Sequence, residues 1–257
     1  MTLTGRLLWR PTAGSARIWA GFGWFVAQMI ALSVGVQAVA VVFATAGGFS
    51  AWQVLSRWAP RPTTASLVVA AVFGAAMPLA GVVGGAQFIG GALLFGVFAS
   101  FGLADLVRFD GAGRTTRAGW LIQSWFPAGL GGACVVLTAS YELGAAVILL
   151  WLIAVYDAGE YLVGADASSV FLGPLAGVLG AWITAFTVVE LGIPPLDGTS
   201  VWRFGVMASI ALPLGSISGS LLLPAASSRA PMMRRLDSLI VMAPAWAWMT
   251  GLLLQDL

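Results

Sequence analysis

The sequence contains no histidine and only one cysteine, Cys134. Without histidine, the chain has no imidazole proton relay, no histidine-ligated zinc site and no Ser-His triad. A single cysteine cannot form a disulfide within the chain, and because Cys134 lies in an apolar stretch we expect a buried, unreactive thiol. Several common classes of enzyme site are therefore excluded.

Charged residues are also scarce. They make up 9% of the 257 residues, whereas hydrophobic residues make up 60% and the mean hydropathy is +0.95. Soluble domains carry about 25% charged residues, so this composition excludes an ordinary soluble domain. Apolar runs long enough to cross a bilayer recur along the chain, which predicts an all-α, polytopic integral membrane protein. No polar stretch is long enough for a separate domain, so we expect one membrane domain over residues 1–257 and no nucleic-acid partner.

The apolar runs predict about nine transmembrane helices. Their expected ranges are 18–34, 35–56, 67–84, 86–104, 120–139, 143–163, 170–190, 201–223 and 238–255. Residues 18–56 are too long for one span of about 20 residues, and we expect them to turn near the sequence SVGVQ. The basic segment 1–17 leads into the first span without a clear cleavage site, so we expect it to be retained.

The arginines favour nine spans over eight. With nine spans, all but one of the 12 arginines fall on the same side of the membrane, and only Arg203 falls on the other. The arginines on the shared side are Arg6, Arg10, Arg17, Arg57, Arg61, Arg108, Arg114, Arg117, Arg229, Arg234 and Arg235. Because cytoplasmic loops carry the excess of basic residues, this division predicts a cytoplasmic N-terminus and an external C-terminus.

Carboxylates at the expected cytoplasmic end of span 143–163 form the first candidate site. Asp157 and Glu160 are three residues apart, so they share one face of a helix, and Asp166 follows them. Such a pair can hold Mg²⁺, which prefers oxygen ligands and shares them with substrate phosphates. The alternative is that both residues simply end the span at the water boundary. Glu142, Glu190 and Asp197 fall on the opposite side, where we interpret them as loop or helix-end charges.

A second polar cluster lies in the sequence MMRRLDSL, residues 232–239. Arg234 and Arg235 can bind phosphate, and Asp237 can bind a metal ion. The alternatives are that the arginines only follow the positive-inside rule, and that Asp237 and Ser238 cap the last helix. Glycines spaced four residues apart precede this cluster, at Gly173/Gly177 and Gly215/Gly219, and predict close helix packing.

Together, these segments resemble the bacterial phosphatidate cytidylyltransferases, also called CDP-diacylglycerol synthases. The likeness is carried by the order and spacing of DAGEYLVG (157–164), GSISGSLLL (215–223) and RRLDSLIVMAPAW (234–246). In that family, an Asp-Thr/Ser-Gly-Ala-Tyr-Phe-Val-Gly-like stretch ends one span, a Gly-Asp-x-x-Glu-Ser stretch ends another, and a Leu-Asp-Arg-x-Asp-Ser motif opens the final helix. The resemblance covers roughly residues 120–250, and the candidate active-site half is 143–250.

The resemblance implies a reaction and a set of site residues. Family members join CTP and phosphatidic acid to give CDP-diacylglycerol and pyrophosphate, with divalent metal ions offsetting the triphosphate charge. By motif position, the likeness implies catalytic roles for Asp157 and Asp237 and substrate binding by Tyr161, Gly164 and Arg235. It also implies Mg²⁺ at Asp157, Glu160 and Asp237. The nearby Arg229 is a further candidate for binding substrate phosphate. Membrane lipids are expected partners, a homodimer is left open, and the family's location implies the bacterial inner (plasma) membrane.

Several charged family positions differ in this chain. The first aspartate of the final motif falls on Arg234, and the acids of the middle motif fall on Ser216 and Gly219. The lysine-rich and His-Gly-Gly elements are missing. These departures give a second hypothesis: a catalytically inactive paralogue that binds a lipid or a partner protein, with Arg234 paired to Asp237 where the metal ion would lie. A transporter is a third hypothesis, which the missing internal repeat disfavours.

Overall fold

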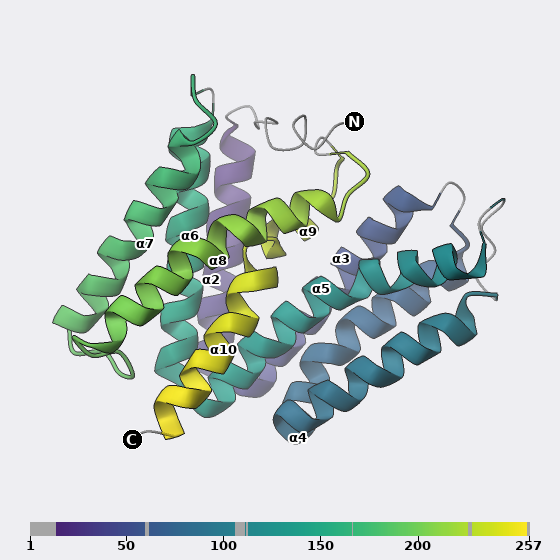
Figure 1. Cartoon of the computed structure of the whole chain (residues 1–257), viewed down its shortest axis with the longest axis horizontal. Coiled ribbons are helices and arrows are strands. Elements are labelled where there is room, and N and C mark those ends of the chain that lie inside the picture. Colours follow the sequence, from purple (N-terminus) through teal and green to yellow (C-terminus); the bar gives the residue numbers. More distant parts are fainter. Residues whose placement is uncertain are drawn as a thin grey trace.

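A computed structural model describes residues 14–59, 62–105, 111, 113–165, 167–225 and 228–255. All regular secondary structure in these residues is helical, as the sequence predicts. The helices are α2 (Ser15–Val34), α3 (Val36–Trp58), α4 (Thr64–Leu103), α5 (Arg114–Tyr141), α6 (Leu143–Gly164), α7 (Leu172–Glu190), α8 (Ser200–Leu221), α9 (Met233–Leu236) and α10 (Leu239–Gln255). Figure 1 shows them packed side by side in one bundle.

Helices α2 and α3 form the hairpin that the sequence predicts. They are separated by Gly35, whose φ of 128° is a conformation that residues with a side chain rarely adopt. Trp24 and Phe43, at similar distances before and after the turn, meet edge to face with ring centroids 5.8 Å apart. The segment therefore doubles back on itself and supplies two helical passes.

Helix α4 combines two of the expected spans, 67–84 and 86–104. Its 40 residues are interrupted by non-helical backbone at Gly84 and Gly85, where Gly85 has a φ of 59°. Both halves return to the same neighbour: Phe73 lies 5.8 Å from the ring of Trp125, and a Cβ on Gly96 would approach that ring to 2.8 Å. The described helices thus include one hairpin within α4, and the nine expected spans all have a helical counterpart.

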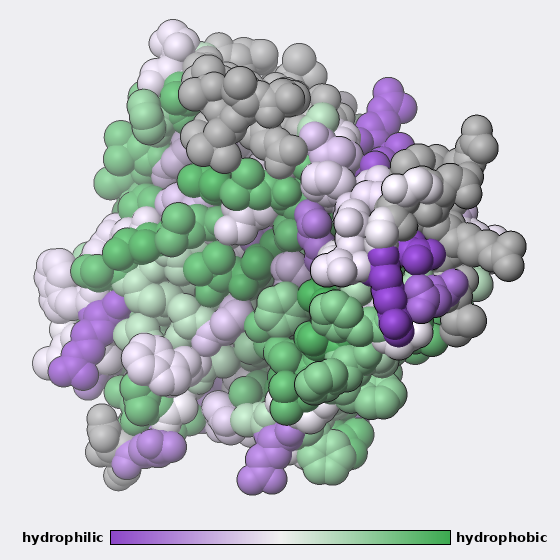
Figure 2. Space-filling view, turned by 45° about the vertical axis from the view of Figure 1, so that its right-hand side comes forward, coloured by the Kyte–Doolittle hydropathy of each residue, from purple (hydrophilic) through white to green (hydrophobic). Residues whose placement is uncertain are grey.

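The described residues include eight helices that are long and apolar enough to cross a membrane. Large apolar side chains cover their outer faces, with Phe171 and Phe98 more than 70% exposed. Figure 2 shows hydrophobic residues over most of one face and the strongly hydrophilic ones mainly near its edges. Because water-exposed proteins seldom carry apolar surface on this scale, the arrangement fits an integral membrane protein.

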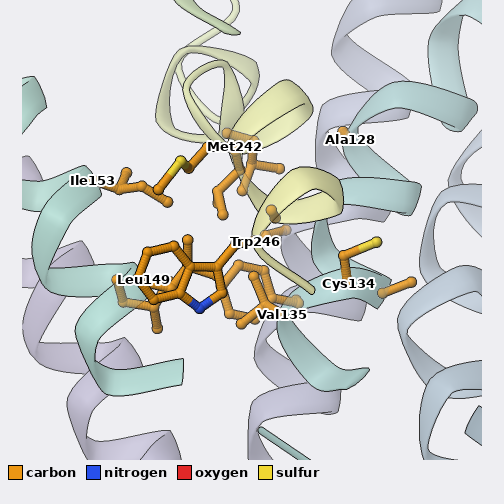
Figure 3. Packing of buried hydrophobic residues seen from close by; sticks show 14 of the residues in the cluster. Ala128, Cys134, Val135, Leu149, Ile153, Met242 and Trp246 are labelled. Atoms are coloured by element: carbon orange, nitrogen blue, oxygen red, sulfur yellow. The ribbon is translucent and has the colours of Figure 1, made fainter. Parts of the chain in front are cut away.

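The interior is built around large side chains from helices near the end of the chain. Trp246 on α10 lies between Leu149 and Ile153 of α6 and Val135 of α5 (Figure 3). Its indole N–H donates to the carbonyl oxygen of Ala145 at 3.1 Å. This bond satisfies the one polar atom of a fully buried ring. Cys134 on α5 is a buried free thiol, as predicted.

Glycines bring α6 and α7 into close contact. A Cβ on Gly173 would lie 2.6 Å from the carbonyl oxygen of Glu160, and one on Gly177 would lie 2.7 Å from that of Tyr156. Close approach through small residues is typical of helices packed in lipid, and it confirms the predicted role of this glycine pair. The contact fixes the end of α6 that carries Asp157 and Glu160.

Glu142 and Asp197 lie just before α6 and α8, and each stabilises the start of the helix that follows it. The Glu142 carboxylate accepts from the backbone N–H of Gly144 at the beginning of α6. The Asp197 carboxylate accepts from the N–H groups of Thr199 and Ser200 before α8. These donors hold the pKa of Asp197 well below its usual value. Both residues are helix-end charges, as the sequence predicts.

Candidate functional site

Gln53 positions the short helix α9. Its side-chain oxygen accepts from the backbone N–H of Met232 at 3.0 Å and of Met233 at 3.5 Å. These are helix-start donors that have no partner inside a helix. The Arg57 side chain adds a bond from Nε to the carbonyl oxygen of Arg229 at 3.1 Å. Helix α3 therefore holds the segment that carries Arg234, Arg235 and Asp237.

The junction between α9 and α10 packs on the Gly215/Gly219 pair of α8. A Cβ on Gly215 would lie 2.7 Å from the carbonyl oxygen of Ser238, and a Cβ on Gly219 would overlap the Cβ of Asp237. The backbone of residues 237–238 thus lies directly on α8. A glutamate at position 219, where the resembling family has one, does not fit this packing.

Ser238 links Asp157 and Asp237, the two aspartates to which the family resemblance gives catalytic roles. Its hydroxyl donates to Oδ1 of Asp157 on α6 at 2.5 Å. Its backbone N–H donates to Oδ1 of Asp237 at 2.9 Å. Asp237 is buried and Asp157 is half-buried. Carboxylates that are 80 residues apart in sequence therefore meet through one serine, and the predicted convergence of the two motifs is present.

Serines on α8 bind the other charged groups. The hydroxyl of Ser216 lies 3.2 Å from both carboxylate oxygens of Glu160. Four residues later, the hydroxyl of Ser220 accepts from Nη1 of Arg234 at 2.8 Å. Because residues i and i+4 lie on one helix face, the repeated Gly-Ser pairs of GSISGS place two glycines and two serines toward the same cluster.

Arg234 faces the carboxylates. Its Nη1 lies 3.9 Å from Oδ2 of Asp237, in a side chain that is 21% exposed. The predicted pairing of Arg234 with Asp237 is therefore present. We call the set of Asp157, Glu160, Arg234, Asp237 and Ser238 the polar cluster.

A pair of arginines borders the polar cluster. Nη2 of Arg235 donates to the carbonyl oxygen of Arg17, at the start of α2, at 2.7 Å. The guanidinium of Arg17 lies 5.6 Å from the ring centre of Tyr161, within cation–π distance. The Tyr161 hydroxyl accepts from the N–H of Gly14 at 2.8 Å. The beginning of α2 thus lies beside the end of α6 (Figure 1), and Arg235 bonds it to α9.

The remaining predicted site residues lie elsewhere. Gly164 contacts the glycine backbone of α7, where a Cβ would lie 3.0 Å from Cα of Gly173, so its observed contact is a packing one. Arg229 is exposed, and within the described residues no hydrogen bond or ion pair joins its side chain to Asp157, Glu160 or Asp237. Asp166, and the arginines Arg6, Arg10, Arg61 and Arg108, lie outside the described residues.

The polar cluster does not fit a preformed magnesium site. Among the described residues, no three carboxylate or thiol side chains lie close enough together to hold a metal ion. Mg²⁺ requires oxygen ligands at about 2.0–2.1 Å in near-octahedral geometry. Here one oxygen of Asp157 is bonded to Ser238, and Asp237 faces the guanidinium of Arg234.

An apolar hollow lies apart from the polar cluster. It has a volume of about 290 Å³ and is lined by Phe126, Pro127, Leu130, Ser218, Leu221, Leu222 and Ile240. None of the acids or arginines of the site lines it. Its lining suits an acyl chain better than a nucleotide, which needs polar contacts.

No protein family model matches the sequence, and comparison with curated proteins finds no relative. What the structure defines is a class: an all-α protein with membrane-length helices and a polar cluster where α6, α8 and α9–α10 meet. Within that cluster, sequence reasoning did not identify Ser238, Ser220 or Arg17 as contributors. The repeated Gly-Ser pairs were a usable signal for Ser220, but nothing in the sequence linked Arg17 to Arg235.

Proposed function

We propose that this chain is a non-transferring relative of the phosphatidate cytidylyltransferases. It is an integral protein of the bacterial inner membrane, with its N-terminus in the cytoplasm and its C-terminus outside. Its arginines bind the phosphate of phosphatidic acid or a related anionic lipid at the inner face. The observation that carries the proposal is the contact between Arg17 and Arg235, which are 218 residues apart in sequence.

The arginine pair is a favourable site for an anion. Arg235 uses one of its N–H groups on the backbone carbonyl oxygen of Arg17, which holds its guanidinium at the start of α2, the helix that carries the second arginine. A phosphate at this place can accept hydrogen bonds from both guanidinium groups, and such charge-assisted bonds are strong. Basic pockets between helices at the cytoplasmic surface commonly bind lipid headgroups for this reason.

The surroundings favour a phosphate that belongs to a lipid. Trp19 and Phe22 lie on the same helix as Arg17, are mostly exposed, and meet edge to face with centroids 6.2 Å apart. Leu162 beside Tyr161 is also exposed. Tryptophan and other aromatic side chains concentrate at the level of lipid headgroups. Acyl chains can therefore lie against α2 and α6 while the phosphate reaches the arginines.

In this proposal the chain does not transfer a cytidylyl group, because its carboxylates are already engaged and several charged family residues are missing. Each carboxylate of the polar cluster already accepts from a serine or faces an arginine. Activation of CTP needs positive charge on the triphosphate, and removal of one such electrostatic contact typically costs an enzyme about 2.7–4 kcal/mol. The chain lacks several of these contacts, because the family's lysines and acids are missing.

Lipid binding is tested on purified full-length protein by native mass spectrometry with added phosphatidic acid or phosphatidylcholine. The proposal predicts retention of phosphatidic acid over phosphatidylcholine, and a loss of about tenfold in Arg17→Gln/Arg235→Gln, corresponding to about 1.4 kcal/mol. Arg203→Gln removes an exposed arginine from the start of α8 and serves as the control. Soluble glycerol phosphate is added in a separate measurement: a site for phosphate alone binds it as well as phosphatidic acid, whereas a lipid site prefers phosphatidic acid. Equal retention of both lipids, or an effect of Arg203→Gln as large as that of the double variant, would refute the proposal.

A second candidate function is the cytidylyltransferase reaction itself, in which CTP and phosphatidic acid give CDP-diacylglycerol and pyrophosphate. It is favoured by the meeting of Asp157 and Asp237 at Ser238, since these are the aspartates to which the family resemblance gives catalytic roles. Incorporation of labelled CTP into lipid that depends on Asp157 supports this candidate over the first.

A further inference from the structure

The charge of the polar cluster raises the question of what stabilises three neighbouring carboxylates without a metal ion. Asp157 and Asp237 are both bonded to Ser238, and Glu160 lies one helical turn after Asp157 on the same face of α6, so three carboxylates gather in one part of the protein. Buried or half-buried acids of like charge are unfavourable unless a cation offsets them. The cation has to come from the protein or from a bound ion.

Arg234 is a cation of the protein that lies beside these carboxylates. Its guanidinium lies 3.9 Å from Asp237 and is fixed by the bond from Nη1 to the hydroxyl of Ser220 at 2.8 Å. The side chain is largely buried between α8 and the α9–α10 junction. Its neighbours on α8 are small residues. Gly219 leaves room for Asp237, and the hydroxyl of Ser220 accepts a hydrogen bond from the guanidinium.

We infer that the Arg234 guanidinium is a built-in cation that takes the place of a divalent metal ion among these carboxylates, and that Arg234→Asp converts the polar cluster into a divalent-metal site. In the native chain, α6, α8 and α10 are held together without metal. The substitution removes the cation, adds a fourth carboxylate and leaves the volume of the long arginine side chain open to an ion and water. The inference does not depend on whether Arg17 and Arg235 bind a lipid.

The test is direct binding of Mn²⁺ to purified full-length protein in detergent, followed by the EPR signal of free Mn²⁺. The native chain is expected to show no saturable site below about 1 mM, a weak limit for specific binding. Arg234→Asp is expected to bind one Mn²⁺ at least tenfold more tightly and to lose that site when Asp157→Asn is added. Arg229→Asp makes the same change in net charge at an exposed position of the same segment and is the matched control.

Two results would overturn the inference. One is saturable Mn²⁺ binding by the native chain that disappears in Asp157→Asn, and this result needs no variant of Arg234. The other is binding by Arg234→Asp no tighter than by Arg229→Asp.

A thermal measurement with a more conservative pair covers the case in which Arg234→Asp does not fold. Arg234→Gln alone leaves Asp237 without its cation and is expected to lower the midpoint of unfolding. Arg234→Gln/Asp237→Asn removes both charges and should recover at least half of that loss. A double variant no more stable than Arg234→Gln would contradict a neutralising role for Arg234.

Discussion

Ser238, in the junction between α9 and α10, donates its hydroxyl to the carboxylate of Asp157 on α6, with 2.5 Å between Oγ and Oδ1. This bond joins α6 to the junction, and the two residues are 81 positions apart in sequence. The same serine binds Asp237 through its backbone N–H. It is therefore the residue through which the two aspartates are held in one cluster.

Ser238→Ala is expected to destabilise the protein because it leaves a half-buried carboxylate without its donor. A hydrogen bond to a charged group contributes about 1.5–3 kcal/mol. A chain of this size loses about 2–4 °C in unfolding midpoint for each kcal/mol. The measurement is thermal unfolding in detergent. Ser33→Ala is the control, since that hydroxyl is exposed and bonds only within its own helix. Equal midpoints for the two variants would contradict the role of Ser238.

Gly219→Ala is expected to disrupt the packing of the α9–α10 junction on α8. The added methyl group overlaps the Cβ of Asp237, so α8 and the junction must separate. Gly90 in α4 is the matched control, because a Cβ there meets nothing within 4 Å. Alanine at an open helical position is favourable by up to about 1 kcal/mol. Thermal unfolding should therefore show a loss of several degrees for Gly219→Ala and none for Gly90→Ala. A neutral Gly219→Ala would show that the contact is absent.

Gln53→Ala is expected to loosen α9 by removing the acceptor for two backbone N–H groups. Loss of a comparable helix cap costs about 0.5–2 kcal/mol. Gln53→Glu keeps an acceptor oxygen at the same place, and its negative charge suits a helix start. Hydrogen exchange of residues 230–238 should rise in Gln53→Ala and stay near native in Gln53→Glu. Faster exchange in both variants by the same factor would mean that Gln53 acts through something other than this bond.

The hydrogen bonds to Asp197, which lies outside the membrane spans, predict that the stability of the protein depends on pH. Its folded-state pKa is lowered by bonds from Ser200 and Thr199, so its contribution to stability is present above the unfolded pKa of about 3.9 and is lost as pH falls through the folded pKa. Asp197→Ala should therefore unfold at lower temperature than the native chain at pH 7, and the difference should shrink below pH 4. A difference that is constant from pH 7 to pH 3 would contradict the capping role.

The sequence is sufficient to predict the helices because apolar length is what a membrane span requires. The pattern at SVGVQ and the GG pair at 84–85 also mark the two hairpins, since glycine can adopt the backbone conformation that a sharp turn needs. The expected spans 67–84 and 86–104 correspond to the two halves of α4, which begins at Thr64, is interrupted at Gly84 and Gly85 and ends at Leu103.

The candidate site is predictable only in part. The convergence of Asp157 and Asp237 follows from motif order, but the bonds that satisfy them do not. Ser238 bonds Asp157 instead of capping the last helix, because Asp157 lies within reach only after α6 packs on α7 and the α9–α10 junction packs on the glycines of α8. The contact of Arg235 with Arg17 depends on where α2 lies, which no local pattern in the sequence specifies.

The measurement that tests the central claim most directly is incorporation of labelled CTP into lipid by purified protein in liposomes that contain phosphatidic acid and Mg²⁺. An active phosphatidate cytidylyltransferase in parallel liposomes is the positive control. Because serines and Arg234 occupy the polar cluster, we predict no labelled CDP-diacylglycerol above that of empty liposomes. Mg²⁺-dependent formation of labelled CDP-diacylglycerol by the native chain, abolished by Asp157→Asn, would contradict the account.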